Sequence, residues 1–276
     1  MTLLKVQELV QKAATFEQNG ALAKARHVYE QVVKFDPGNL LAHEGLGRIS
    51  RDEGNAAEAI ASFERCLQID PKHMDSHMHI GAILYGDLQT EEAVPYFQKA
   101  IAYHPIDEEA HRMLGLCYLN LGKPKEALVS IDKSIELFPE GFMSYYMKGF
   151  YYLGMSDPDK AEIMFKTCVK NRINNGDAHA ELGNIYLNRG MATMAIESYQ
   201  NAIGFEHSNP QTFTNMASAY MINQNYEVAI KLLDMALGKN PNLLEAYEKM
   251  AECFEKLGDM QTAIKIKQRI QQMKGG

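Results

Sequence analysis

The sequence predicts an all-α fold, a solenoid built from eight tandem helix–turn–helix repeats. Three observations predict it: the chain resembles itself every 34 residues, small and large apolar residues recur at helical spacing within each copy, and glycine and proline recur at fixed points between them. A unit of this size cannot bury its own apolar face, so it must stack on a neighbour.

The repeat frame begins at Val6 and returns to its first position at residues 40, 74, 108, 142, 176, 210 and 244. Position 20 of the frame is alanine in every copy: Ala25, Ala59, Ala93, Ala127, Ala161, Ala195, Ala229 and Ala263. Position 8 is glycine or alanine: Ala13, Gly47, Gly81, Gly115, Gly149, Gly183, Ala217 and Ala251. Small residues at both positions allow two helices to approach closely.

Positions 7, 8 and 11 share one face of a first helix, helix A, and positions 20, 24 and 27 share one face of a second, helix B. Glycine at position 15 permits the turn between them: Gly20, Gly54, Gly122, Gly190 and Gly258. Proline at position 32 ends helix B: Pro37, Pro71, Pro105, Pro139 and Pro241. We expect one array over residues 6–273, with residues 1–5 starting the first helix and 274–276 as a tail. Irregular junctions near 173–177 and 205–210 predict altered angles or mobility between repeats.

This pattern resembles the tetratricopeptide repeat family, whose signature is W-x2-L-G-x2-Y, then A-x3-F, then P. The corresponding segments here are HRMLGLCY and HAELGNIY, then AVPYF, AEIMF and AIESY. The resemblance covers residues 6 to about 273 and departs from the family in one respect, since the chain has no tryptophan. It implies a right-handed superhelix in which positions 2, 5, 6, 9, 12 and 13 of helix A face a concave groove.

Composition limits the classes of partner. The formal net charge of −7 argues against nucleic-acid binding, which needs a basic face. No apolar run reaches the length of a membrane span, so no membrane insertion is expected. Lys5 and Glu8 interrupt the apolar stretch that a secretory signal requires, and we therefore expect a cytoplasmic protein.

Three histidines crowd the segment HMDSHMHIG, where His73, His77 and His79 raise the question of a metal site. Position 4, which holds tryptophan in the family, is occupied by His43, His77, His111 and His179. A flat ring with a polar tip suits a packing position, and metal ligands must converge, so we predict packing histidines, no metal and no cofactor. The four cysteines show no zinc spacing and are expected to be buried thiols.

The groove positions of repeats 3 to 5 are rich in methionine and aromatic residues where a solvated face should be polar. Exposed apolar patches mark partner sites, and methionine adapts to varied partners. The candidate peptide-binding residues there are Met78, His79, Arg112, Met113, Leu116, Tyr146, Met147 and Phe150. The alternative is that these side chains pack against one another.

Asn184 and Asn215 complete the candidate set. In family members that clamp the C-terminal carboxylate of chaperones, asparagine occupies these two positions in successive repeats. The rest of that clamp is absent, because Ala180, Glu245 and Lys249 stand where the family has two lysines and an arginine. We therefore expect contacts to a peptide main chain rather than recognition of a chaperone tail.

No phosphate-binding glycine loop, nucleophile elbow or paired-carboxylate motif appears, and the repeats use the whole chain. We expect a non-enzymatic scaffold or adaptor that binds a peptide or helix of another protein in its concave groove. One alternative is a structural scaffold that self-associates into a homo-oligomer. A second alternative is a partner that presents substrates to a separately encoded enzyme.

Overall fold

The computed structural model describes residues 3–172, 175–205, 207 and 209–275, and within these residues it contains sixteen α-helices and no strand. The predicted all-α repeat fold is confirmed. The irregular junctions expected near 173–177 and 205–210 include residues 173, 174, 206 and 208, which lie outside the described residues. So do residues 1, 2 and 276 at the predicted ends of the array.

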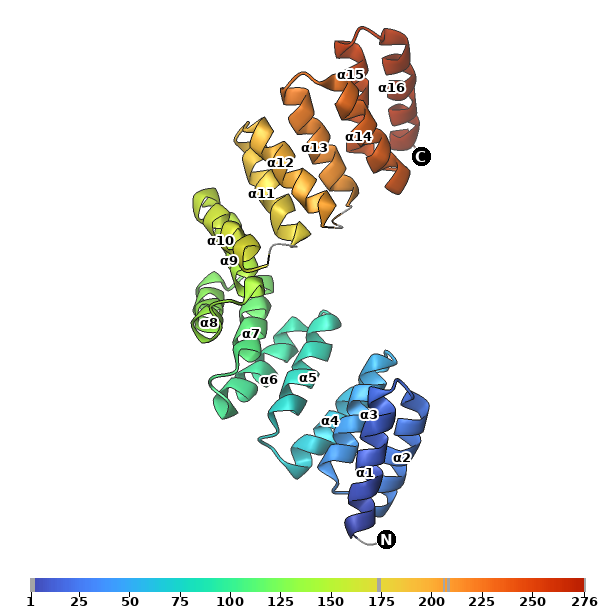
Figure 1. Cartoon of the computed structure of the whole chain (residues 1–276), viewed down its shortest axis with the longest axis vertical. Helices are drawn as coiled ribbons and strands as arrows, with labels where there is room; N and C mark the ends of the chain where they lie inside the picture. The colour runs from blue at the N-terminus through green and yellow to red at the C-terminus, as the bar shows by residue number, and fades with distance from the viewer. Residues whose placement is uncertain (1–2, 173–174, 206, 208, 276) are drawn as a thin grey trace. The chain divides into compact units, whose positions relative to one another are not determined.

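The chain divides into two compact units, Met1–Pro139 and Glu140–Gly276. Unit 1 contains α1 (Leu3–Gln18), α2 (Leu22–Phe35), α3 (Leu40–Asp52), α4 (Ala56–Ile69), α5 (Met74–Gly86), α6 (Thr90–Tyr103), α7 (Glu108–Asn120) and α8 (Pro124–Leu137). Unit 2 contains α9 (Phe142–Gly154), α10 (Pro158–Asn171), α11 (Gly176–Asn188), α12 (Ala192–Gly204), α13 (Pro210–Ile222), α14 (Tyr226–Lys239), α15 (Leu244–Lys256) and α16 (Met260–Gly275). Consecutive helices form hairpins that lie side by side within each unit (Figure 1).

Odd-numbered helices correspond to helix A of the repeat and even-numbered helices to helix B. Polar side chains cap several of them, as where Asn39 accepts from the backbone N–H of Ala42 and Asp107 accepts from that of Ala110. The last helix, α16, continues through Lys274, which pairs with Glu248 at 2.8 Å, into the segment expected to be a tail.

The turn inside each repeat has one backbone geometry. The five glycines at position 15 have φ between 64° and 85°, as the sequence predicts. The same position in the other three repeats holds Leu88, Ser156 and Gln224, and these adopt φ of 62°, 57° and 58°. The stacked helices therefore impose a left-handed turn even where the sequence supplies no glycine.

In four repeats a glycine at position 8 lies against the aromatic ring at position 24, and in a fifth Gly115 lies against Ile131. A Cβ added to Gly81 would lie 2.9 Å from the ring of Phe97, and one added to Gly149 would lie 2.6 Å from the ring of Phe165. The position-20 alanines are buried in every repeat. These contacts explain why small residues recur at both positions.

Histidines at position 4 are packing residues, as predicted. In three of the four, the Nε2 atom lies at hydrogen-bond distance from the carbonyl oxygen of the preceding proline: His43 with Pro37 (2.9 Å), His77 with Pro71 (3.0 Å) and His111 with Pro105 (3.0 Å). The fourth, His179, stacks on the ring of Phe205 with the centroids 5.6 Å apart. His77 is only 2% exposed. All four cysteines are buried, and burial raises the pKa of each thiol to about 11. In the described part of the chain, no helix is long and apolar enough to cross a membrane.

Candidate functional site

A hollow of about 370 Å³ opens on the helix A side of unit 1. We call it the methionine hollow, and it is lined by Arg51, Met74, Asp75, Met78, His79, Ala82, Asp107, Glu109 and Met113. The last turn of α3 supplies the arginine, and α5 supplies the residues from 74 to 82. The N-cap and the first two turns of α7 supply the rest. Side chains from three successive repeats thus meet at one surface.

The methionines form the apolar part of the hollow. Met78 and Met113 are half-buried and pack against the core cluster that contains Phe97 and Leu114. Their side chains therefore have one side in the core and the other in the hollow. Since methionine is unbranched and flexible, this lining can adjust to different apolar side chains.

Carboxylates outnumber cations in the methionine hollow. Arg51 donates to the carboxylate of Asp52 at 2.8 and 3.0 Å. Among the lining carboxylates, Glu109 pairs with the neighbouring Arg112 at 3.0 Å, and Asp107 accepts the 2.6 Å bond that caps α7. Asp75 is exposed and has no ion pair among the described residues.

His79 contributes a neutral ring. It lies on the ring of Phe63 with the centroids 4.7 Å apart, and its Nδ1 accepts from the Arg51 guanidinium at 3.2 Å. Burial, reinforced by Arg51, lowers the pKa of His79 to about 4. The ring is therefore uncharged at neutral pH and leaves the excess of negative charge in place.

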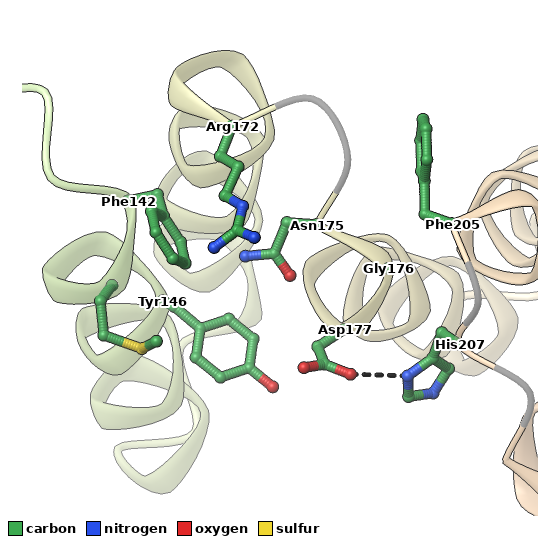
Figure 2. Close-up of a pocket in the computed structure, with 9 residues that line it drawn as sticks. Phe142, Tyr146, Arg172, Asn175, Gly176, Asp177, Phe205 and His207 are labelled. Carbon is green, nitrogen blue, oxygen red and sulfur yellow. Dashed lines mark hydrogen bonds and ion pairs between the residues drawn. The ribbon is translucent and has the colours of Figure 1, made fainter. Parts of the chain in front are cut away.

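Unit 2 carries a different pocket, of about 300 Å³, which Figure 2 shows. We call it the aromatic pocket, and it is lined by Phe142, Met143, Tyr146, Arg172, Asn175, Gly176, Asp177, Phe205 and His207. The Arg172 guanidinium lies 4.6 Å from the centre of the Phe142 ring. His207 Nδ1 is 2.6 Å from a carboxylate oxygen of Asp177, toward which the Tyr146 hydroxyl points (Figure 2). Burial, followed by the charge of Asp177, raises the pKa of Tyr146.

A cluster of three aromatic rings continues from the aromatic pocket, with Tyr146 and Phe150 on α9 and Phe165 on α10. Tyr146 and Phe150 pack edge to face at 4.9 Å, and both pack on Phe165 at 5.7 and 5.5 Å. Phe150 is 40% exposed. Met147 is only 5% exposed, so the expectation that its side chain is available to a bound peptide is corrected: it is buried in the core.

A row of amides crosses α11 and α13. The side-chain oxygen of Asn184 accepts from the Tyr199 hydroxyl at 2.8 Å and from the amide of Asn215 at 2.9 Å. Asn215 accepts in turn from Gln211 at 3.0 Å, and the Asn184 amide donates to Glu181 at 3.2 Å. Glu181, Asn184 and Asn215 border a hollow of about 590 Å³ that is also lined by Glu245 and Lys249. We call the five hydrogen-bonded residues the asparagine row: Glu181, Asn184, Tyr199, Gln211 and Asn215.

The structure brings some predicted site residues together and leaves others apart. Met78, His79 and Met113 line the methionine hollow, Arg112 lies beside it, and Leu116 is half-buried outside its lining. In unit 2, Tyr146 lines the aromatic pocket, while Asn184 and Asn215 bond to each other.

Sequence reasoning missed several charged lining residues. Asp75 and Glu109 occupy position 2 of the repeat, one of the groove positions that the resemblance implies, so the repeat frame contained a signal for them. Asp107, Arg172 and His207 lie at helix ends or in junctions, where the repeat frame does not predict the direction of a side chain. Among the described residues, no group of three or more histidine, cysteine or acidic side chains could hold a metal ion.

Hairpins of constant length and small residues at fixed positions define a helical-repeat protein. The chain belongs to the tetratricopeptide repeat family: models with that description match residues 11–73, 84–140, 144–172, 176–206 and 214–274. Membership of this family indicates a protein–protein interaction scaffold.

Individual relatives are similar over parts of the chain. A small glutamine-rich tetratricopeptide repeat-containing protein of Dictyostelium discoideum is 37% identical over 68 residues, which are 25% of this chain and 20% of that protein. The chain thus matches about a fifth of the length of this relative.

Solved structures show the fold. Pseudomonas aeruginosa pilF has a TM-score of 0.70 and 19% identity, covering 77% of this chain and 97% of its own. A Parabacteroides merdae tetratricopeptide repeat protein has a TM-score of 0.67 and 17% identity, covering 90% and 98%. MamA has a TM-score of 0.56 and 24% identity, covering 60% and 96%.

Proposed function

We propose that the chain is a non-enzymatic scaffold that binds a peptide or helix of a partner protein on its helix A faces. The methionine hollow carries this proposal. Met74, Met78 and Met113 come from two successive repeats and line one open hollow, an arrangement that can receive an apolar side chain. Burying one such side chain contributes about 1.5–3 kcal/mol.

The asparagine row supports contacts to a peptide main chain in unit 2. The amide nitrogen of Asn184 donates one hydrogen to Glu181, and that of Asn215 donates one to Asn184. A side-chain amide has two hydrogens, so each keeps one that can reach a peptide carbonyl. Each neutral bond of this kind contributes about 0.5–1.5 kcal/mol, enough to fix a bound chain but not to hold it alone.

The test is selection from a library of random peptides on the immobilised full chain. The test variant is Met78→Gln/Met113→Gln, which keeps side-chain length and removes the apolar surface. The control variant is Met191→Gln/Met194→Gln, which changes two exposed methionines beside and within α12. Thermal melts followed by circular dichroism establish that each variant is folded.

Peptides that bind wild type and the control variant but not the test variant support the proposal. Peptides that bind the test variant equally well refute it for this hollow. Light scattering on the same samples addresses self-association. If wild type selects no peptide and is larger than one chain, and this assembly dissociates in the test variant, then the hollow serves a second copy of the chain instead.

A further inference from the structure

We propose that the methionine hollow selects a basic segment, in which an apolar anchor side chain is flanked by lysine or arginine. This inference rests on the proposed function and adds the chemistry of the partner. It is carried by the charges of the hollow together with its methionine lining.

The hollow has unbalanced negative charge. Its lining includes three carboxylates, Asp75, Asp107 and Glu109, against one guanidinium, Arg51. That guanidinium is already bonded to Asp52, outside the lining. The nearby Arg112 pairs with Glu109 at 3.0 Å and with Glu108 at 3.5 Å, so it neutralises Glu109 but reaches neither aspartate. Asp75 and Asp107 are thus left to attract a cation from a partner.

The carboxylates and methionines are placed to contact different side chains of one bound segment. Asp75 and Glu109 are exposed, whereas Met78 and Met113 are half-buried. An apolar anchor can therefore lie on the methionines while flanking side chains reach the carboxylates. Lysine and arginine suit this arrangement because their stems cover apolar surface and their charged ends stay in water.

An acidic segment would be disfavoured at the same place. Its carboxylates would approach Asp75 and Asp107, and like charges in contact oppose binding. His79 offers no compensating charge at neutral pH, because its neutral ring is packed on Phe63 and accepts from Arg51.

A rival explanation assigns these carboxylates to the helices alone. Asp75 and Glu109 lie in the first turns of α5 and α7, where negative charge is favourable, and Asp107 is the N-cap of α7. This explanation predicts that the charge of a bound peptide has no effect on affinity. The two explanations therefore differ in a quantity that can be measured directly.

The experiment measures fluorescence anisotropy with three synthetic peptides that share one apolar anchor and differ in their flanks: lysine, glutamine or glutamate. The full chain is compared with Asp75→Asn/Asp107→Asn, which removes two charges and retains a good N-cap at residue 107. The control variant is Asp87→Asn/Glu91→Gln, which makes the same change in net charge outside the hollow.

We expect the lysine-flanked peptide to bind wild type and the control variant more tightly than the other two. We expect its affinity for Asp75→Asn/Asp107→Asn to fall about 5- to 20-fold, the effect of losing two partly exposed ion pairs. The glutamine-flanked peptide should bind all three proteins equally. The preference for lysine should shrink as salt rises from about 50 to about 500 mM.

Failure of the inference is distinguishable from failure of the proposed function. Equal affinity for lysine and glutamine flanks, or an unchanged affinity in Asp75→Asn/Asp107→Asn, overturns the basic-segment inference and leaves peptide binding standing. Absence of binding by all three peptides, together with a library selection that enriches nothing, overturns both.

Discussion

Acidification is expected to destabilise unit 1 through His79. Its ring lies on Phe63 and accepts from Arg51, and burial with this neighbouring charge lowers its pKa from 6.5 to about 4. The folded state therefore favours the neutral ring, while the unfolded state takes up a proton near pH 6.5. The contribution of His79 to stability is complete above pH 6.5 and is lost as the pH falls from 6.5 to about 4.

The magnitude follows from the two pKa values. A difference of one pKa unit corresponds to about 1.4 kcal/mol, so the full interval would give at most about 3.5 kcal/mol. His79 is only half-buried, and solvent screening reduces the expected loss to about 1–2 kcal/mol. Most of this loss should already be present at pH 5.

The assay combines an NMR titration of the His79 ring with urea unfolding at pH 7 and pH 5. Wild type is compared with His79→Asn and with His104→Asn, which changes an exposed histidine at the end of α6. We expect acidification to cost His79→Asn about 1–2 kcal/mol less than it costs the other two proteins. The reasoning is refuted if the ring titrates near pH 6.5, or if all three proteins lose the same stability.

Two further predictions concern backbone and packing. Leu88→Gly should raise the free energy of unfolding by about 0.5–1 kcal/mol. Leu88 has φ of 62° and is 88% exposed, so the substitution relieves backbone strain without loss of packing. The control Asp87→Gly, at φ of −83°, should not stabilise the protein. Gly81→Ala should lower the free energy of unfolding by about 1–2 kcal/mol, because the new Cβ would lie 2.9 Å from the Phe97 ring. Gly86→Ala is in the same helix, and its new Cβ would have nothing within 4 Å, so this variant should raise the free energy of unfolding by about 0.5 kcal/mol. Urea unfolding checks both, and a Gly81→Ala protein as stable as Gly86→Ala would contradict the packing argument.

The repeat frame predicted the core because core positions follow directly from helix geometry. Small residues at positions 8 and 20 allow two helices to approach, and in two repeats the rings of Phe97 and Phe165 fill the remaining space. The left-handed turns at Leu88, Ser156 and Gln224 could not be predicted from residue type, because none of the three is glycine. They follow instead from the fixed spacing between helices A and B.

The candidate site was less predictable, because its properties depend on which side chains pair with one another. Met78 and Met113 could be assigned to a surface from the repeat frame. Whether Asp75 has a cationic partner depends on the direction in which Arg51 turns, and it turns to Asp52 and His79. The ion-pair partner of a long, flexible side chain is not encoded in the periodic pattern of the sequence.

His77 and His79 show how one helix contributes both to the packing of repeats and to the lining of the methionine hollow. His77, at a packing position of α5, places Nε2 3.0 Å from the carbonyl oxygen of Pro71, and its Nδ1 is buried without a hydrogen-bond partner. His79, two residues later, lines the methionine hollow beside Arg51. The first position is constrained by the stacking of repeats, while the second holds different residues in different repeats, such as Met113 and Asn215 at the equivalent position. The binding specificity that we propose for the methionine hollow therefore rests on positions whose residue type changes from repeat to repeat.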